Sequence, residues 1–386
     1  MNNYLSAAIS RFKKITITGL ALLSMAMLIL MPQSAADGVR SALDVCQSLV
    51  IPALFPMMFI AAFIMDSGVA VWLGRLFSLP SRLLFGLPGE AGIAVLMAMI
   101  GGYPTGASVI SSLCERKIIT SKQASRMILF CVAPSPVFVV GAIGIHLLGS
   151  VRVGFVTLAA QLISVILVGF ITRFLPGGKN EPPSDNHNPP VVNRQLSNAV
   201  ISAARKAASS IIMVCAFVII FGAAVSILQG SGILAKIEDL LTSIGVQQQV
   251  AGSIIPIMLE VTGNCGTSVI APNIQTGILL LAFGIGFGGF AVHFQIFSIL
   301  RDLPVSRPLF FAARLLQGIL ACLLTCVMLP LMNLDAVIDT ISVSASVSGS
   351  YLPTLHAMPT ASGSVFLIVM CMMLIFTSDS FNRDFA

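Results

Sequence analysis

Charged residues are scarce in this chain. Only 9% of its 386 residues are Asp, Glu, Lys or Arg, whereas soluble domains carry roughly 25%. Hydrophobic residues make up 56%, and the mean hydropathy is +0.98. A soluble core cannot bury so large a share of apolar residues, so the composition excludes an ordinary soluble protein of this length.

The sequence also lacks the common motifs of nucleotide, metal and nucleophile chemistry. It contains no P-loop, no His/Glu zincin motif and no nucleophile elbow, which argues against an ATP-driven pump or a membrane hydrolase. None of the eight cysteines forms a C-x-x-C pair. Cys322 and Cys326 lie four residues apart in an apolar run, and we interpret them as small packing residues. We therefore predict no enzymatic activity, no cofactor and no metal site.

Long apolar runs are abundant instead. A helix that crosses a bilayer needs about 20 mostly apolar residues, because every backbone group must be hydrogen-bonded within its own segment. Roughly eight to ten transmembrane or re-entrant helices follow, so the predicted fold class is an all-α polytopic membrane protein. The runs that meet the test or nearly meet it are 15–31, 42–65, 92–113, 127–148, 153–175, 207–228, 250–272, 276–299, 309–333 and 363–377.

The basic residues mark topology. The net charge is +6, but Lys and Arg occur in short clusters beside apolar runs, at 11–14, 115–126 and 205–206. Such clusters are typical of cytoplasmic loops in membrane proteins. We therefore predict the lipid bilayer of the cell membrane as the surroundings, a multi-pass topology, and no nucleic-acid partner. A homo-oligomer is compatible with the sequence.

Composition divides the chain into segments. Residues 1–36 have the basic and apolar parts of a secretory signal, but the apolar run is long and no clean cleavage site follows, so we predict an uncleaved transmembrane anchor. Residues 176–205 form a polar, Pro-rich linker between the segments 42–175 and 206–333. A polar loop, 334–361, lacks Lys and Arg and is predicted on the non-cytoplasmic side, before a last transmembrane segment at 362–378.

The segments 42–175 and 206–333 resemble each other. Gly106–Ile110 matches Gly266–Ile270, and Asp66–Gly68 and Gly230–Gly232 precede these motifs by similar distances. Each segment also contains an interrupted apolar run, at 133–136 and at 284–289. We predict two repeats with helices broken at the membrane midplane, an arrangement that points to a transporter's binding site. Whether the repeats are parallel or inverted stays open, because residues 69–88 could be an interfacial helix or a short span. Placing both basic loops, 115–126 and 176–206, in the cytoplasm requires an additional crossing near 69–88 or a re-entrant hairpin at 92–113.

The strongest local signal is the stretch 101–108, in the middle of an apolar run. Proline removes a backbone donor and three glycines weaken the helix, so we predict a break there. Backbone groups freed at membrane depth are tolerated when they line a wet cavity or are buried in protein. A packing kink is the alternative interpretation. The predicted binding residues of this break are Gly102, Tyr103, Pro104, Thr105, Gly106 and Ser108.

The stretch 260–268 is the counterpart in the second half. A charge at the bilayer centre costs at least ~2.5 kcal/mol, so Glu260 is expected to face the interior. The alternative for Glu260 is a helix end near the interface. Thr262, Asn264 and Ser268 complete this group of predicted binding residues.

Three further residues belong to the predicted site. His293 and Gln295 form a second polar spot deep in an apolar run, although a lone membrane histidine can equally serve an interhelical hydrogen bond. Ser135 lies between Pro134 and Pro136. The helix N-termini exposed at such breaks carry free N–H groups and partial positive charge, which suits an anionic ligand.

The stretches 99–107, 259–265 and 288–293 together resemble the YlbJ-type sporulation integral membrane proteins. These belong to a wider Gate-domain group related to nucleoside transporters, spore maturation proteins and the membrane part of FeoB iron transporters. The resemblance covers roughly residues 40–330. Residues 131–136 depart from the Asn-containing version of the family. The resemblance implies a helical, transporter-like fold with two repeats. It also implies, for YlbJ-type members, a role in moving dipicolinic acid across the outer forespore membrane.

Three classes of function remain open at this point. Paired broken helices with buried polar groups favour a transporter of a small solute, and the helix N-termini at the breaks suit an anion. A membrane gate or assembly partner without its own substrate would need the breaks but not Glu260, Asn264 or His293. A membrane enzyme is the third class and has the least support. Within the transporter class, the resemblance adds a nucleoside or metal transporter as an alternative.

Overall fold

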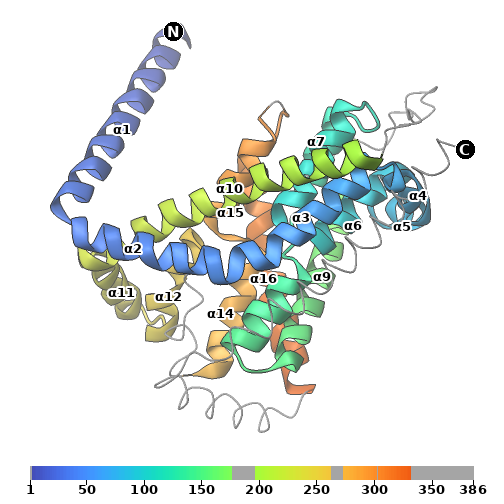
Figure 1. Cartoon of the computed structure of the whole chain (residues 1–386). Coiled ribbons are helices and arrows are strands. Elements are labelled where there is room, and N and C mark those ends of the chain that lie inside the picture. The colour runs from blue at the N-terminus through green and yellow to red at the C-terminus, as the bar shows by residue number, and fades with distance from the viewer. Residues whose placement is uncertain (1, 176–195, 262–272, 302, 332–386) are drawn as a thin grey trace, which may run out of the picture.

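The computed structural model describes residues 2–175, 196–261, 273–301 and 303–331. Every regular element in these ranges is a helix, so the predicted all-α class is confirmed. Most of the linker, the polar loop 334–361 and the last predicted span 362–378 lie outside the described residues. Figure 1 shows the helices packed into one body, from which the first helix, α1 (Asn2–Leu30), projects.

Several of the predicted spans appear as single long helices. Five helices in the described part of the chain are long and apolar enough to cross a membrane, and a sixth candidate is the bent pair Ser78–Phe85 and Gly89–Gly101, which turns by 99°. This number agrees with a polytopic membrane protein. The five are Pro32–Asp66, Val151–Thr172, Leu196–Gly230, Ile274–Ile299 and Arg307–Met328.

The first of these spans joins three elements. α2 (Pro32–Val45), the π-helical η1 (Cys46–Val50) and α3 (Ile51–Asp66) follow one another without a break. α1 ends just before Pro32, which removes a backbone donor and so favours a new helix start. Residue 36, the predicted end of the anchor, therefore lies inside α2.

α10 (Leu196–Gly230) runs antiparallel to this span (Figure 1). Ser226 Oγ donates to the carbonyl oxygen of Ser34 at 2.7 Å, and Ser202 Oγ donates to Asp66 at the other end of the pair. A Cβ on Gly38 would lie 2.6 Å from Ser226 Cβ, so the backbones approach closely, as small residues allow in membrane helices. α3 and α10 begin the two predicted repeats. Their opposite directions favour an inverted relation, and the repeat itself stays a prediction.

Residues 69–88 do not form a span. α4 (Val69–Leu76) and α5 (Ser78–Phe85) have eight residues each, about 12 Å of helix. Trp72 and Leu79 are 66% and 65% exposed. Short helices with exposed apolar residues are typical of the membrane interface, so the interfacial alternative fits the structure.

The predicted run 92–113 is a hairpin of two short helices. The 3-10 turn η2 (Gly89–Ala91) leads into α6 (Gly92–Gly101), and α7 (Tyr103–Glu115) follows after one residue. A Cβ on Gly106 would lie 2.7 Å from Ala98 Cβ, which requires α7 to fold back along α6. The arms of 10 and 13 residues correspond to about 15 and 20 Å of helix. Each is shorter than a bilayer core of about 30 Å, which favours a re-entrant hairpin.

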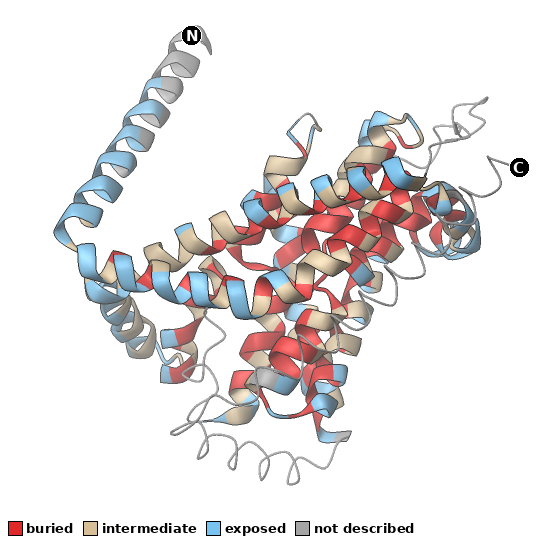
Figure 2. Cartoon of the chain, viewed as in Figure 1, coloured by how far each residue is buried: buried red, intermediate tan, exposed pale blue. Residues whose placement is uncertain are grey.

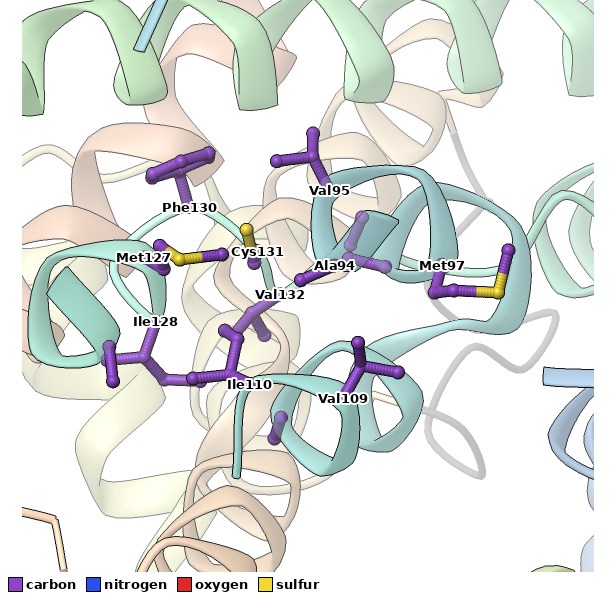
Figure 3. Packing of buried hydrophobic residues seen from close by; sticks show 14 of the residues in the cluster. Ala94, Val95, Met97, Val109, Ile110, Met127, Ile128, Phe130, Cys131 and Val132 are labelled. Atoms are coloured by element: carbon purple, nitrogen blue, oxygen red, sulfur yellow. The ribbon is translucent and has the colours of Figure 1, made fainter. Parts of the chain in front are cut away.

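The predicted run 127–148 is also interrupted. α8 (Ser121–Met127) starts with a capping box of Thr120 and Gln123, and the chain is irregular before the π-helical η3 (Val137–Leu147). Pro134 and Pro136 explain the interruption, because proline disfavours the α conformation of the preceding residue and removes a donor. Buried residues of this irregular segment, such as Phe130 and Val132, pack against Val95 of α6 and Ile110 of α7 (Figure 3).

The remaining helices enclose the hairpin and the irregular segment. α9 (Val151–Thr172), α14 (Ile274–Phe287), α15 (Gly289–Ile299) and α16 (Arg307–Met328) pack together, followed by the 3-10 turn η4 (Leu329–Leu331). α11 (Ile233–Ser243) and α12 (Gln248–Leu259) connect α10 to this group. Figure 2 shows that buried residues concentrate where these helices meet α6 and α7.

Candidate functional site

The first helix break lies where the sequence predicts it. Gly102 has φ 88° and ψ −179° and separates α6 from α7. Pro104 is in the first turn of α7, where its missing N–H costs no helical hydrogen bond. Thr105 Oγ1 donates to the carbonyl oxygen of Gly101 at 2.9 Å and so satisfies one of the groups that the break leaves free.

The second break of the first half meets the first. Ser135 is buried, and its Oγ accepts a hydrogen bond from the backbone N–H of Phe138 at 3.2 Å, which caps the start of η3. A Cβ on Gly102 would lie 3.3 Å from Ser135 Cβ. Two interruptions that are 33 positions apart in sequence (102 and 135) are therefore neighbours in space.

The break between α14 and α15 is formed by two left-handed glycines. Gly288 has φ 88° and Gly289 has φ 67°, conformations that other residues adopt only with strain. The carbonyl oxygens at the end of α14 find side-chain donors here. Tyr103 Oη donates to Ile285 O at 2.6 Å. His293 Nε2 lies 2.8 Å from Phe287 O and donates to it, because a carbonyl oxygen only accepts.

Arg314 joins the two halves at this point, and sequence reasoning missed it. Its guanidinium is fully buried and donates to Val132 O at 2.6 Å and Phe287 O at 3.2 Å, as well as to Gly286 O and to Gln317 Oε1. The end of a helix carries partial negative charge, which stabilises a cation placed there. A charged residue inside the apolar run 309–333 was the signal that could have found it.

Four predicted site residues from both halves line one small hollow. Its volume is about 20 Å³, about that of one water probe. Apolar side chains close the hollow on its other sides. The predicted residues are Tyr103, Pro104, Ser135 and Gln295, and the apolar ones are Leu54, Phe138, Val214 and Val292.

A larger cavity of about 410 Å³ begins at Pro104 and extends along α7 as far as Glu115, between α3 and α10. The two flanking helices contribute different chemistry. α3 lines it with apolar residues, Met58, Ala61, Ala62 and Met65, whereas α7 and α10 supply hydroxyl groups from Thr105, Ser108, Ser111, Ser112, Ser209 and Ser210. The cavity therefore connects the first helix break with the basic loop after α7.

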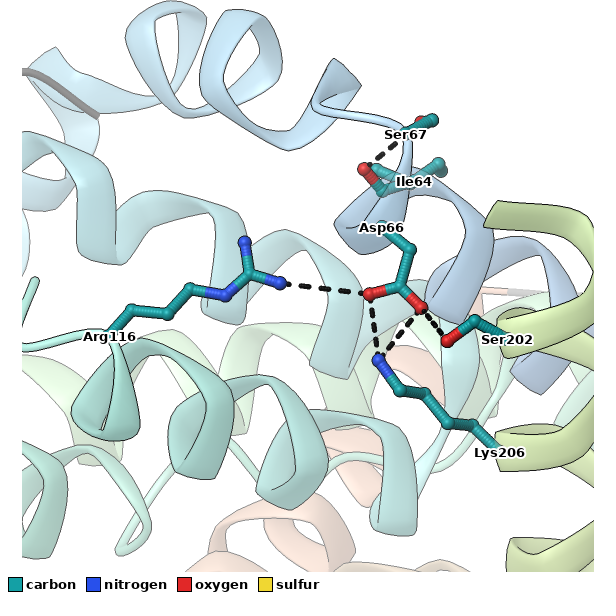
Figure 4. A network of polar contacts seen from close by, with 6 residues as sticks. All are labelled: Ile64, Asp66, Ser67, Arg116, Ser202 and Lys206. Carbon is teal, nitrogen blue, oxygen red and sulfur yellow. Dashed lines mark hydrogen bonds and ion pairs between the residues drawn. The ribbon is translucent and has the colours of Figure 1, made fainter. Parts of the chain in front are cut away.

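A charge cluster lies at the mouth of this cavity, the end beside the basic loop after α7. Figure 4 shows its residues. The buried carboxylate of Asp66 accepts hydrogen bonds from Lys206 Nζ at 2.7 and 2.8 Å and from Ser202 Oγ at 2.7 Å. Arg116 adds an ion pair at 3.7 Å. The cluster ties the ends of α3 and α7 to α10, and Arg205, Lys206 and Glu115 line the cavity itself.

The other predicted residues occupy different places. Gly106 is a packing position, because a Cβ there would lie 2.2 Å from Cys131 O. Glu260 is buried at the end of α12, as predicted, but does not line either hollow. His293 is enclosed by the rings of Phe287, Phe290, Phe310 and Phe311, which favours its hydrogen-bonding role. Thr262, Asn264 and Ser268 lie outside the described residues.

The geometry can be compared with known proteins. The chain is 25% identical, over 335 residues, to the sporulation integral membrane protein YlbJ of Bacillus subtilis (strain 168), covering 81% of this chain and 82% of that protein. The chain is thus similar over most of its length to a YlbJ-type integral membrane protein. The match confirms the resemblance inferred from residues 99–107, 259–265 and 288–293. No family model and no solved structure matches the chain.

Proposed function

We propose that the chain carries a small polar solute across the membrane, with the helix breaks as its binding site. The cavity along α7 carries this proposal, because it leads from a predicted cytoplasmic loop to the break at Pro104. The cavity has six hydroxyl side chains among its apolar lining residues, which a scaffold without a substrate would not need. Polar groups inside a membrane protein usually mark the path of a substrate or an ion.

The dimensions of the cavity limit the solute to a small molecule. Its volume of about 410 Å³ falls within the range of roughly 300–1,000 Å³ for small-molecule pockets. The residues on α7 that line it recur at positions 104–105, 108–109, 111–112 and 115, which is one face of a helix. A solute entering along this face would exchange its bound water for the row of hydroxyl groups.

The charges at the cavity mouth favour an anion. Arg116, Arg205 and Lys206 are basic, and Asp66 and Glu115 are acidic, so three positive and two negative charges leave one net positive charge. A positively charged mouth raises the local concentration of anions and speeds their entry. A small carboxylate is therefore the first class of solute to test, and dipicolinate is the one that the YlbJ-type resemblance implies. Nucleosides and divalent cations are the alternatives.

The relative's name adds a biological setting. YlbJ is a sporulation integral membrane protein, so we infer a role in spore formation and a place in the outer forespore membrane for an organism that sporulates. A membrane partner of spore assembly without a substrate of its own would share that setting. Solute uptake distinguishes the two roles.

The test is uptake by the purified full-length protein in proteoliposomes, measured with radiolabelled small carboxylates, nucleosides and divalent cations. We expect saturable uptake of a carboxylate, lowered at least tenfold by the combined substitutions Thr105→Val and Ser108→Ala. Ser298→Ala is the matched control, because Ser298 donates within its own helix and does not line the cavity. Absence of saturable uptake in all three solute classes would refute the transport proposal.

A further inference from the structure

A second set of polar residues is buried on α9 and α16, which pack against each other and against α14. On each helix the residues recur at spacings of three, four or eight, so they share one face. All are at most 1% exposed. We call them the polar row; its members are Thr157, Gln161 and Ser164 on α9 and Arg314, Gln317 and Thr325 on α16.

Both helices that carry the row contact α14. Gln161 Nε2 donates to Ala282 O at 2.8 Å, and Arg314 donates to Gly286 O, one turn further along α14. A Cβ on Gly286 would lie 2.8 Å from the Cα of Gly318. The polar faces of α9 and α16 are thus brought to the same stretch of the same helix.

Four atoms of the row have no hydrogen-bond partner among the described residues. They are Thr157 Oγ1, Gln161 Oε1, Gln317 Nε2 and Thr325 Oγ1. Each buried polar atom left in this way destabilises the fold by ~1–3 kcal/mol, whereas an apolar residue of the same shape would not. Four such atoms on two facing helices point to an interface that becomes hydrated in another conformation.

The inner end of the row adjoins the inner end of the cavity. Arg314 binds Val132 O and Gly286 O, and Tyr103, whose neighbour Pro104 lines the cavity, binds Ile285 O next to Gly286. The Tyr103 side chain therefore spans from the inner end of the cavity to the stretch of α14 that Arg314 contacts. The hydrogen bonds of Tyr103 and Arg314 lie between the cavity and the row.

The outer end of the row lies toward the opposite face of the membrane. α16 begins beside the predicted cytoplasmic loop, because Ser125 Oγ donates to Pro304 O at 3.0 Å, just before α16 starts at Arg307. Thr325 is in the last turn of α16. It is 11 residues beyond Arg314, about 16 Å along the helix. The row thus leads from the breaks to the non-cytoplasmic side.

We propose that the polar row is the outward half of the solute's route, held shut in this conformation. This inference rests on the proposed transport function. In the present arrangement the cavity is open and the row is closed. Separation of α16 from both α9 and α14 would hydrate the four atoms and would break the bonds of Arg314 to Gly286 O and Phe287 O at the helix breaks. The two halves of the route would then open alternately.

The first test removes the polar atoms without changing the shape of the interface. We expect Thr157→Val combined with Thr325→Val to raise the midpoint of thermal unfolding in detergent, by about 2 °C or more, and to lower uptake at least tenfold. Thr172→Val is the control on α9, because Thr172 is equally buried but donates to Gly169 O at 2.8 Å. It should lower the midpoint and leave uptake within twofold. A lower midpoint in the double variant, or unchanged uptake, would overturn the proposal.

The second test needs no identified solute. Gln161→Cys and Val165→Cys are made separately in a full-length chain whose eight cysteines have been replaced; Val165 is also fully buried on α9. Intact cells receive a membrane-impermeant methanethiosulfonate from outside. We expect Gln161→Cys to react at least fivefold faster than Val165→Cys. Equal rates, with uptake intact, would place the route elsewhere and leave the transport function standing. Faster reaction of Gln161→Cys without uptake of any solute would instead refute transport.

Discussion

The hydroxyl group of Tyr103 donates to the carbonyl oxygen of Ile285 at 2.6 Å, across 182 positions of sequence. The bond joins the tip of the α6–α7 hairpin to the end of α14, close to where α14 breaks. Each partner lies at an interruption in its own half of the chain. The break in one half thus supplies a donor for a carbonyl group near the break in the other.

Tyr103→Phe removes this donor and keeps the ring. Ile285 O would be left without its side-chain partner in a buried place, so we expect the protein to lose ~1–3 kcal/mol of stability. Thermal unfolding in detergent measures the loss, and solute uptake should fall with it. If Tyr103→Phe unfolds at the same midpoint temperature as the wild type, the hydrogen bond does not stabilise the contact between the two halves.

Among the residues that connect the two halves at the helix breaks, we expect Arg314 to be the one whose substitution lowers stability most. Arg314→Met leaves the carbonyl oxygens of Val132 and Gly286 without their side-chain donor, and each buried acceptor left unsatisfied costs ~1–3 kcal/mol. Arg314→Lys should be nearly as harmful, because one ammonium group cannot reproduce the planar fork that reaches three carbonyl groups. The yield of folded protein from membranes and its thermal midpoint are the measurements. Wild-type values for Arg314→Lys would contradict the geometric argument.

The charge cluster at the cavity mouth predicts strong coupling between Asp66 and Lys206. Lys206→Met leaves the buried carboxylate of Asp66 with Ser202 at 2.7 Å and Arg116 at 3.7 Å, so stability should fall. Asp66→Asn made together with Lys206→Met removes the unpaired charge and should recover part of the loss. A double-mutant cycle on thermal stability measures the coupling, which we expect at ~0.5–3 kcal/mol. Additive effects would show that the two residues do not stabilise one another.

Pro104 and Gly106 are predicted to have separable roles. Replacing both by Ala should abolish function without preventing membrane insertion. Gly106→Ala alone brings a Cβ within 2.2 Å of Cys131 O, so it should also destabilise the hairpin by ~1–3 kcal/mol. Pro104→Ala alone should keep stability and lower uptake, because Pro104 lines both hollows. Wild-type uptake by the double variant would remove the break from the binding site.

Glu260 tests whether a carboxylate at the second-half break takes part in transport. It is buried at the end of α12, where the backbone becomes extended. If it carries a proton, Glu260→Gln should abolish the pH dependence of uptake and slow net flux, while ligand binding stays within about tenfold, or ~1.4 kcal/mol. Uptake against pH in both proteins decides the question. An unchanged profile would exclude Glu260 from proton movement.

The sequence by itself determined the features that depend on local chemistry. Apolar runs of sufficient length predict membrane helices, since backbone groups in hydrocarbon must bond within their own segment. The breaks at Gly102, at Ser135 and at Gly288 were predictable for the same kind of reason. Glycine and proline change the backbone conformations available at their own positions, whatever surrounds them.

Only the tertiary structure decided which of these features meet. The sequence left residues 69–88 and 92–113 ambiguous, because helix length and hairpin formation depend on contacts such as that of Gly106 with Ala98. The role of Arg314 was hidden for a related reason. Its acceptors, Val132 and Gly286, are distant in sequence and are backbone groups, which leave no mark in the residue pattern. The cavity likewise exists only because α3, α7 and α10 pack with hydroxyl and apolar faces opposed.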